Sequence, residues 1–558
     1  MDQFQLISGL KINLTKCKAV WIGRNRNYHV QICMDLKLIW SHNFTLLGID
    51  FDADLANIDT NFRKKFEDIK SIYNSWLYRH LSPLGRVTVI KALALSKLSS
   101  VVLVCPHISP NLLKELTSIS FKFLWRNKPD RMKRVEAKLP LDKGGLNMPD
   151  ISNFWKSLKI SWTRRLMNSD CVWQKVLQLN ILCAGFEMKD ILYGGPELLR
   201  SAGRTLENTF WKETILALAD LCEETPAAHP LLFFHLNIFN NKLFSSRGVC
   251  LDKNDFPDLW HKSVAQAGDF YDCSTSPPTL LSIQDLKEKY DVRLNFLQYL
   301  RIKTMLELAA TNINSNIYHK IYSDLQRPRL PLIYKLSSVQ KKGCSSFYKT
   351  LRASELSKIS MASCEEKWHS ETGMTFSPDF WDKVWNMSKK SIVQNKMKWV
   401  TIQINRHILP TNYTVNKYKP NVDPGCSLCT NSHAEKLKTL LWDCQVVQDF
   451  WKIIQNLLSA HFPGFVLGVK EAIFGDLESE GSSVQNTILL LSRQFIWRQK
   501  FTSKTLDEVQ FINFIINELK NLFNAQFYKG KVQQFIHDWQ TIFDHFGVEY
   551  GSLDEFIL

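Results

Sequence analysis

The chain lacks the short motifs that most often identify an enzyme from sequence. No Asp-Asp dipeptide occurs anywhere, and there is no Gly-x-x-x-x-Gly-Lys, no His-Glu-x-x-His and no Gly-x-Ser-x-Gly. These motifs would supply, in turn, paired metal-binding carboxylates, a phosphate-binding loop, zinc-binding histidines with a general base, and a nucleophilic serine. Their absence argues against nucleotide hydrolysis, zinc proteolysis and serine hydrolysis. It also argues against phosphoryl transfer by two metal ions, which needs carboxylates converging on one site.

Segments for export or membrane insertion are also missing. The N-terminus has no basic region followed by an apolar core, so no signal peptide is expected. The most apolar stretch, residues 87–108, contains Lys91 and Lys97, whereas a membrane span needs about 20 residues with few charges. We expect a buried amphipathic helix there. The 13 cysteines are odd in number and follow no disulfide framework, which favours a reducing compartment. The expected location is intracellular, nuclear or cytoplasmic, neither secreted nor membrane-bound.

The charge balance is the first positive feature. The 558 residues carry 70 Lys and Arg against 54 Asp and Glu, a net charge of +16, while 45% hydrophobic residues are ordinary for a folded protein. A chain of this length usually forms more than one domain. The basic excess favours a polyanionic partner such as nucleic acid.

Hydrophobic periodicity predicts a mainly α, multi-domain fold with a small N-terminal β-containing (α+β) part. The β-branched runs that predict short strands are 18–22, 30–32 and 46–51. Apolar spacings of three and four predict helices over 61–80, 86–104, 111–126, 151–166, 381–407, 446–458, 483–499 and 506–527. Ser109 with Pro110, and Asp150, are expected to begin two of these helices.

A basic segment at residues 122–134 is the sharpest charge feature. Its cations, against the single acid Asp130, are Lys122, Arg126, Lys128, Arg131, Lys133 and Arg134. Phe121, Phe123 and Trp125 alternate with the first of them. Cations neutralise phosphates, and neighbouring aromatic faces can stack on bases. The alternative is a solvated helix C-terminus, where the helix dipole favours cations without any ligand.

One cysteine pair has the spacing of metal ligands. Cys426 and Cys429 form a Cys-x-x-Cys motif, Cys444 follows fifteen residues later, and His433 lies between them. Three thiolates and an imidazole could bind zinc tetrahedrally. The alternative is that these are incidental or buried cysteines.

Short motifs spread in order along almost the whole chain carry a family resemblance. They lie at residues 4–16, 46–49, 84–91, 95–98, 123–128, 143–150, 248–249, 296–301, 408–412, 426–429, 442–444 and 450–451. The most specific are Phe-Leu-Trp-Arg-Asn-Lys at 123–128 and Lys-Gly-Gly-Leu-Asn-Met-Pro-Asp at 143–150. In this order they resemble the C-terminal half of the reverse transcriptase polyprotein of non-LTR (LINE-type) retrotransposons, in the L-one/Tx-like branch.

The resemblance implies a division of the chain into four regions. Residues 1–57 would be a palm remnant with strands, and residues 58–170 a helical thumb that carries the basic segment. Residues 171–375 would form a connecting region between the thumb and the C-terminal part, with irregular structure first and helices after it. Residues 376–558 would form a C-terminal helical domain with the family's zinc-binding motif.

Two departures from the family limit the expected activity. The catalytic palm with its paired aspartates, and the endonuclease, would lie before Met1, so the chain is expected to be a truncated product without a catalytic magnesium site. It should not polymerise DNA by itself, although the parent activity is RNA-directed DNA polymerase in target-primed reverse transcription. The family's histidine five residues before its last cysteine is replaced by Thr439, so a zinc site either recruits His433 or keeps three thiolates.

The resemblance also implies partners. A thumb holds a primer-template duplex through its phosphates, so the expected partners are RNA and RNA–DNA or DNA duplexes, with a complete reverse transcriptase in trans as a further one. The cations of the basic segment would make these contacts, together with Lys91, which either extends to solvent from an apolar helix face or points at the nucleic acid. Two other hypotheses are a domesticated RNA- or DNA-binding protein and a degenerate reading frame without function.

Overall fold

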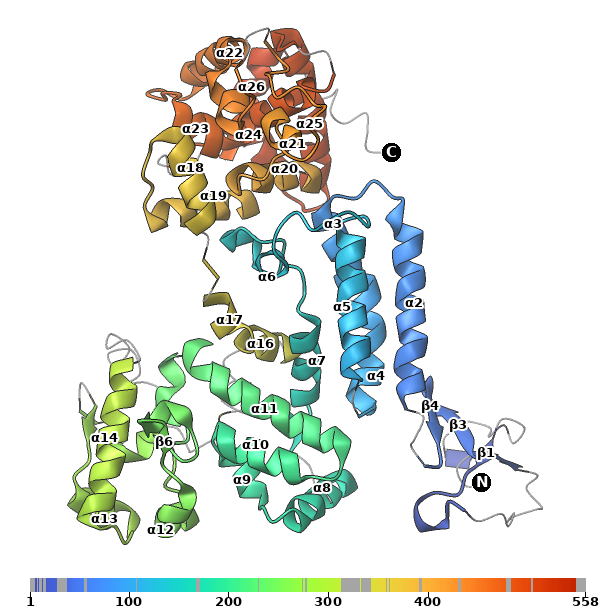
Figure 1. Ribbon diagram of the computed structural model, residues 1–558, viewed down its shortest axis with the longest axis vertical. Helices are drawn as coiled ribbons and strands as arrows, with labels where there is room; N and C mark the ends of the chain where they lie inside the picture. The colour runs from blue at the N-terminus through green and yellow to red at the C-terminus, as the bar shows by residue number, and fades with distance from the viewer. Residues whose placement is uncertain are drawn as a thin grey trace. The chain divides into compact units, whose positions relative to one another are not determined.

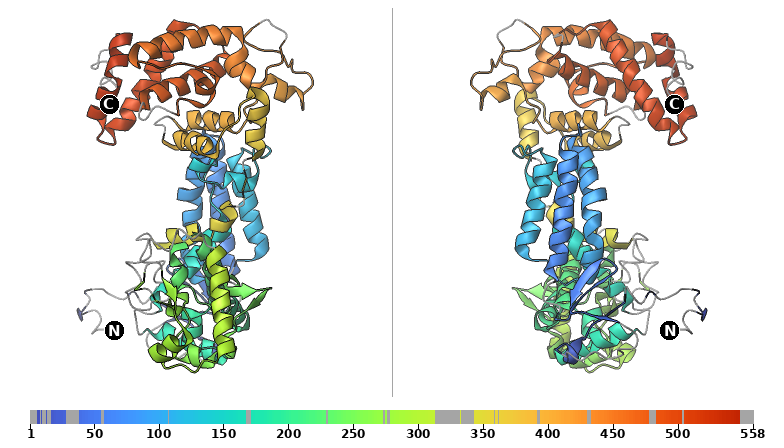
Figure 2. Two further views of the ribbon diagram at one scale, coloured as in Figure 1. Left: turned by 90° about the vertical axis from the view of Figure 1, so that its left-hand side faces the viewer. Right: turned by 90° about the vertical axis from the view of Figure 1, so that its right-hand side faces the viewer.

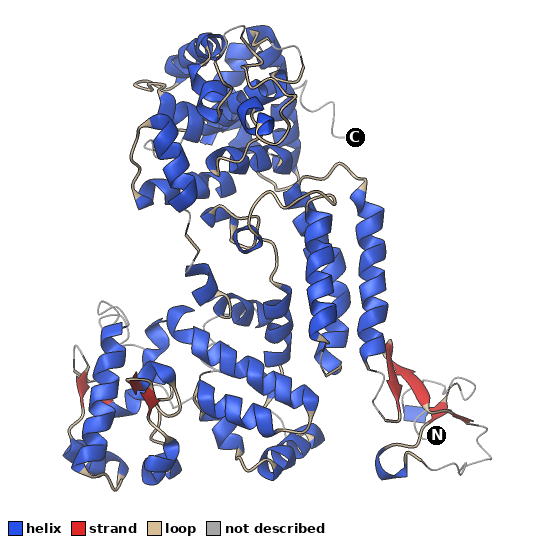
Figure 3. Ribbon diagram, in the orientation of Figure 1, coloured by secondary structure: helices blue, strands red, loops and turns tan. Residues whose placement is uncertain are grey.

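The structure is a computed structural model, and it is mainly helical with a few short two-stranded sheets (Figures 1 and 3). This confirms the mainly α class. The residues that the structure describes are 6–7, 9, 13, 17–27, 38–54, 58–106, 108–166, 171–228, 230–272, 274–275, 278–312, 332, 343–357, 359–360, 362–390, 394–429, 433–477, 483–502 and 505–547.

The chain forms two compact units, each assembled from separate stretches. One contains Met1–Leu77, Ile90–Ser120 and Asp150–Lys358, and the other contains Tyr78–Val89, Phe121–Pro149 and Ile359–Leu558. The expected division into four consecutive regions stays a prediction.

The first unit holds the strands and two helical cores. Its strands are β1 (Lys18–Ala19), β2 (Ile39–Trp40), β3 (Asn43–Leu46), β4 (Ile49–Asp52), β5 (Ser245–Ser246), β6 (Val249–Cys250), β7 (Tyr271–Asp272) and β8 (Thr279–Leu280). Its helices include α2 (Asp59–Leu77), α4 (Ser99–Val104), α7 (Ile151–Ile160), α8 (Val172–Cys183), α9 (Met188–Tyr193), α10 (Pro196–Thr205), α11 (Thr209–Ala228), α12 (Pro257–His261), α13 (Ile283–Tyr290), α14 (Phe296–Asn312), α16 (Gly343–Thr350) and α17 (Ala353–Ser357). The helix α5 (Pro110–Leu124) begins in this unit.

The N-terminal sheet differs from the expectation at 46–51. Leu47 and Gly48 both have positive φ, of 50° and 78°, so they form a tight turn between β3 and β4, which pair antiparallel with Leu46 opposite Ile49. The prediction of one strand over 46–51 is wrong, because an apolar run cannot reveal a turn that uses leucine at positive φ. β1 confirms the start of the strand at 18–22, and the predicted strand 30–32 lies outside the described residues.

A long apolar helical segment spans Pro83–Val104 and confirms the predicted helix at 86–104. It is not regular: a π turn at Ile90–Ala94 and a 3₁₀ turn at Leu95–Leu98 separate α3 (Pro83–Val89) from α4. By length and composition alone this segment could cross a membrane. However, Ile90, Ala94 and Leu98 are buried, and the part of the segment from Ile90 to Leu98 packs on α2, which lies in the same unit (Figures 1 and 2). Apolar core helices of soluble proteins have the same character, and this burial favours that interpretation.

Two predicted helix starts are confirmed by their hydrogen bonds. The Asp150 side chain accepts a hydrogen bond from the backbone N–H of Asn153 at 2.8 Å at the start of α7. The Ser109 hydroxyl accepts one from the backbone N–H of Leu112 at 3.3 Å, with Pro110 as the first residue of α5. Each bond satisfies a backbone donor that the helix itself leaves without a partner.

The second unit is a helical core formed mostly by the C-terminal part of the chain. Its helices are α3, α6 (Arg134–Ala137), α18 (Ala362–Thr372), α19 (Pro378–Lys390), α20 (Asn395–Asn405), α21 (Asn412–Asn416), α22 (Gln445–His461), α23 (Val469–Phe474), α24 (Ser483–Gln499), α25 (Glu508–Phe527) and α26 (Val532–Phe546). The predicted helices 446–458, 483–499 and 506–527 are confirmed. The single helix predicted over 381–407 is wrong, because its apolar spacing continues across two helices, α19 and α20, that pack on each other.

Residues 121–149 belong to this second unit and are anchored on α19 and α20. Arg406, just after α20, contacts the carboxylate of Glu136 at 2.6 Å and also donates to the carbonyl of Gly144. Lys143 pairs with Asp382 at 2.7 Å. The backbone that carries the basic segment is therefore fixed to the C-terminal helices by buried and exposed ion pairs.

Candidate functional site

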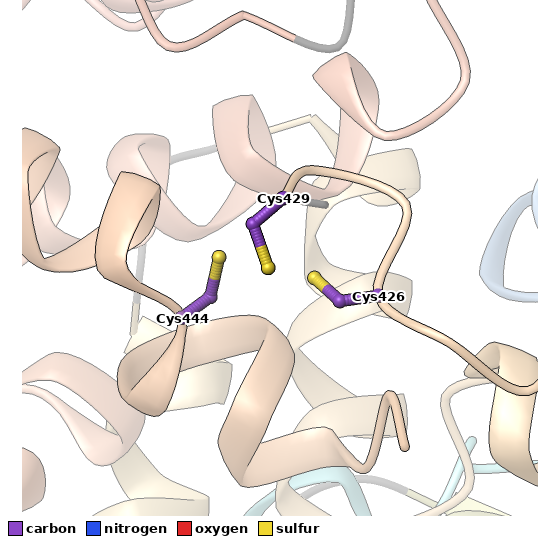
Figure 4. Close-up of side chains that lie close together, drawn as sticks. All are labelled: Cys426, Cys429 and Cys444. Atoms are coloured by element: carbon purple, nitrogen blue, oxygen red, sulfur yellow. The ribbon is translucent and has the colours of Figure 1, made fainter. Parts of the chain in front are cut away.

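Three cysteines meet in the second unit, as Figure 4 shows. The Sγ atoms of Cys426, Cys429 and Cys444 all lie within 4.8 Å of one another. Thiolates bound to one tetrahedral zinc ion are about 3.8 Å apart, given a Zn–S distance of about 2.3 Å. The three sulfurs thus lie close to the separations that zinc requires, although Cys444 is distant from the other two in sequence.

Local backbone structure directs the first two sulfurs inward. The backbone N–H of Cys426 donates to the carbonyl of His433 at 3.2 Å, and Gly425 pairs with Ala434, so residues 425–426 lie side by side with residues 433–434. The backbone N–H groups of Leu428 and Cys429 point at the Cys426 sulfur. Such N–H groups stabilise a thiolate or a metal-bound sulfur.

The third sulfur is placed by a helix end. Cys444 is the N-cap of α22, and it follows a π turn over Thr439–Asp443. Its backbone N–H donates to the Thr439 carbonyl at 3.1 Å. The start of α22 therefore carries the third sulfur to the other two.

Cys426 and Cys444 differ in how firmly they hold their protons. The thiol of Cys444, together with backbone N–H groups, donates to Cys426 and lowers the pKa of Cys426 to about 5. The same contact and partial burial raise the pKa of Cys444. A metal ion that binds the group would displace the proton that Cys444 retains. Three cysteine sulfurs suit a thiophilic cation such as zinc, so the structure supports the prediction that these cysteines could bind a metal ion.

The fourth ligand that the sequence suggested does not join this group. His433 is exposed, and its carbonyl rather than its imidazole contacts the loop. Among the residues that the structure describes, the metal-ligating side chains grouped here are the three cysteines alone. This arrangement corresponds to the three-thiolate alternative.

A buried carboxylate organises the cysteine loop, and sequence reasoning missed it. Glu435 is fully buried and accepts hydrogen bonds from the Ser427 hydroxyl at 2.7 Å and from the backbone N–H of Asn412 at 2.8 Å. It also contacts the ammonium of Lys500, which is 5% exposed. A single acid in a polar loop gives no periodic signal, so only the tertiary contacts identify it.

The basic segment presents its cations to solvent. All six predicted residues are exposed, from Lys122 at the end of α5 to Arg134 at the start of α6. Arg126 and Asn127 have φ of 56° and 57°, so the chain turns sharply after the helix. Arg134 pairs with Asp130 at 2.8 Å, and Lys133 lies 4.0 Å from Glu136. Within the described part of the chain, no carboxylate forms an ion pair with Arg126, Lys128 or Arg131.

The aromatic residues of this segment do not face solvent. Phe121, Phe123 and Trp125 are at most 5% exposed. Phe121 lies under the Arg134 guanidinium at 4.8 Å, and Trp125 packs on Trp399 with ring centroids 5.8 Å apart. The prediction that these rings stack on bases is wrong, because their side of α5 packs into the core. The segment offers charge without a stacking surface.

Lys91 belongs to the other unit. It is exposed on the π turn of the apolar segment. Partial desolvation, with a smaller contribution from repulsion by Arg352, lowers its pKa to about 8. A role for Lys91 in nucleic-acid binding stays a prediction.

A scan against protein-family models finds no match to this chain.

Proposed function

We propose that this chain is the nucleic-acid-binding part, thumb and C-terminal region, of a non-LTR retrotransposon reverse transcriptase, and that it binds RNA-containing duplexes through phosphates. The observation that carries the proposal is the exposed, largely unpaired charge of the basic segment. Phosphate contacts need exposed cations on a fixed backbone and no base-reading groups. With its aromatic residues buried, the segment has this character.

The anchoring of residues 121–149 supports this role. An exposed loop of cations would lose conformational entropy on binding, whereas a segment fixed by Arg406 and Glu136 loses less. Nothing in this arrangement supplies paired carboxylates, and the proposed activity is binding rather than polymerisation.

We assign a structural role to the cysteine group within the same proposal. Zinc held by Cys426, Cys429 and Cys444 would tie the Cys-x-x-Cys turn at 426–429 to the start of α22. The chemistry that zinc supplies when bound is a cross-link between thiolates. Glu435 and the backbone N–H groups around Cys426 hold the loop in the conformation that presents its sulfurs.

Salt-dependent binding of the full chain tests the proposal. The probe is an RNA–DNA hybrid duplex of about 16 base pairs, and the variant combines Arg126→Ala, Lys128→Ala and Arg131→Ala. We expect weaker binding and a smaller dependence of log K on log salt, by about one for each phosphate that the variant no longer neutralises.

The matched control removes three exposed cations of the first unit, through Lys114→Ala, Lys287→Ala and Arg293→Ala. It has the same net charge as the test variant, so it should bind like the wild type if the site is local. Equal weakening by both triples would show attraction to net charge alone and contradict the proposal. A wild-type chain without salt-dependent binding would instead favour a degenerate reading frame.

A further inference from the structure

The turn between α25 and α26 carries exposed aromatic rings beside cations. In the basic segment, by contrast, the aromatic rings are buried. Tyr528 is 87% exposed and Phe527 is 43% exposed, and their ring centroids lie 5.8 Å apart. Lys529 and Lys531 follow directly and are also exposed. This turn, like α24, belongs to the second unit, and it joins the helices labelled α25 and α26 in Figure 1.

The backbone holds these side chains at a defined helix end. The N–H of Gly530 donates to the carbonyl of Phe527, and the N–H of Lys531 donates to the carbonyl of Gln526, each at 3.0 Å. Gly530 has φ of 66°, a conformation that glycine adopts without strain. This helix-ending motif fixes Tyr528 on the outside of the last turn and turns the chain directly into α26.

Phosphate-binding groups lie next to the rings. The first turn of α26 has no side-chain cap, so its backbone N–H groups remain available beside Lys529 and Lys531. The positive end of a 15-residue helix together with two ammonium groups favours an anion. Lys398 on α20 adds charge near the same turn, since repulsion from Lys529 contributes, after burial, to lowering its pKa.

A pocket opens beside this turn between α24, α25 and α26. Its lining includes Ser483, Thr487, Gln526, Lys529, Phe535 and Trp539. Gln526 is 4% exposed, and its amide oxygen has no hydrogen-bond partner among the described residues. An unpaired buried acceptor is costly, so rotation of the Gln526 amide towards a ligand N–H in the pocket would be favourable.

We propose that this surface binds single-stranded nucleic acid, with a base stacked on Tyr528, its phosphate at Lys529, Lys531 and the start of α26, and a neighbouring base in the Gln526 pocket. Exposed rings, cations and a pocket with a polar group together match the recognition of unpaired bases. A duplex cannot use the rings, because its bases are already stacked. The site is separate from the basic segment and does not require the duplex-binding function proposed above.

The test compares single-stranded and duplex binding by the full chain. The probes are a single-stranded RNA of about 16 nucleotides and the RNA–DNA hybrid duplex of the same length. We expect Tyr528→Ala to raise the Kd for the single strand by about fivefold or more and to leave duplex binding unchanged. Tyr528→Phe keeps the ring and should bind like the wild type. Because Tyr528 is exposed, neither change threatens folding.

Tyr78→Ala is the matched control, since Tyr78 is also a highly exposed tyrosine, at 80%. It should not change single-strand binding. Gln526→Leu tests the pocket and should weaken the single strand only. A Tyr528→Ala variant with unchanged single-strand binding, or with equal losses on both probes, would overturn the proposal. So would displacement of the RNA by polyglutamate as efficiently as by unlabelled RNA, because that would show recognition of charge without bases.

The two proposals fail separately. If the Arg126, Lys128 and Arg131 variant loses duplex binding and Tyr528→Ala has no effect, the duplex site is supported and the single-strand site is contradicted. Single-strand binding that depends on Tyr528, in a chain whose duplex binding ignores the basic segment, would do the reverse. A single-stranded DNA of the same length shows whether the sugar is read.

Discussion

The ammonium of Lys500 contacts the carboxylate of Glu435 in the interior of the second unit, where the two side chains are 3% and 0% exposed. Lys500 comes directly after α24, whereas Glu435 lies in the loop that carries Cys426 and Cys429. Through this pair, the position of the cysteine loop depends on a helix that is distant in sequence. The same carboxylate binds Ser427, so one ion pair connects the helical core to the Cys-x-x-Cys turn.

Removing one partner of this pair should destabilise the unit strongly. Glu435→Ala leaves the Lys500 ammonium buried without its counter-charge, which typically costs about 3–5 kcal/mol. The measurement is the free energy of unfolding by denaturant. The double variant Glu435→Gln with Lys500→Met should recover much of the loss, because it removes both charges. A loss below about 1 kcal/mol in Glu435→Ala would show that the ion pair does not hold the loop.

The cysteine group can be tested by zinc content and affinity. We expect Cys444→Ser to lose bound zinc and His433→Ala to retain it, because the His433 side chain is exposed and outside the group. Thr439→His introduces the histidine of the zinc-binding motif that this region resembles and should raise the affinity by about tenfold or more in competition with a chelator. Zinc below about a tenth of an equivalent in the wild-type chain would exclude a zinc site.

Two arginines of the basic segment should respond differently to the same substitution. Arg131 has no ion pair among the described residues, so Arg131→Ala should weaken duplex binding without changing stability. Arg134 pairs with Asp130 and lies over the Phe121 ring. Arg134→Ala should therefore also lower the unfolding free energy, by about 0.5–1 kcal/mol. Thermal melting beside a binding titration separates the two effects. Equal melting temperatures for both variants would remove the structural role of Arg134.

Stability should rise with pH between about 8 and 10.5 because of one buried lysine. The Lys159 ammonium is fully buried and donates to the carbonyls of Cys105 and Pro106 at 2.5 and 2.7 Å. Burial lowers its pKa from 10.5 to about 8, although Glu213 opposes the shift. In this window the unfolded chain holds the proton and the folded chain releases it, so raising the pH favours folding.

The expected gain across that window is on the order of 3 kcal/mol. It is read as the difference in pH dependence between the wild type and Lys159→Met, measured by denaturant unfolding under reducing conditions. Parallel curves for the two proteins would show that Lys159 keeps its ordinary pKa.

Gly145 should be intolerant of any side chain. A Cβ atom built there would lie 2.0 Å from the Leu139 carbonyl oxygen, a backbone atom that cannot move aside locally. Gly145→Ala should lower the unfolding free energy by roughly 1–3 kcal/mol and weaken duplex binding by loosening residues 121–149. Gly530→Ala is a useful comparison, because space is free there and only its positive φ opposes the change. A neutral Gly145→Ala would contradict the close approach.

Local pattern in the sequence determined much of the secondary structure. The residues of α2, α22, α24 and α25 repeat apolar side chains at helical spacing, and Asp150 and Ser109 begin their helices through contacts only three residues away. The exposure of the cations in the basic segment could likewise be predicted, because Lys and Arg side chains are rarely buried without a partner. The proximity of Cys426 and Cys429 could also be predicted, because only two residues separate them.

Relations between distant residues were decided by tertiary packing. The sequence shows that Phe121, Phe123 and Trp125 are aromatic, which would suit either base stacking or a core. They are buried because this side of the chain packs on other helices, and the sequence does not show which side that is. Cys444 joins the other cysteines, and Lys500 joins Glu435, because separate helices pack in one core. Leu47 enters a turn at positive φ, although a residue with a side chain disfavours that conformation. Each outcome depends on free energy summed over contacts between segments far apart in the chain, which no local pattern encodes.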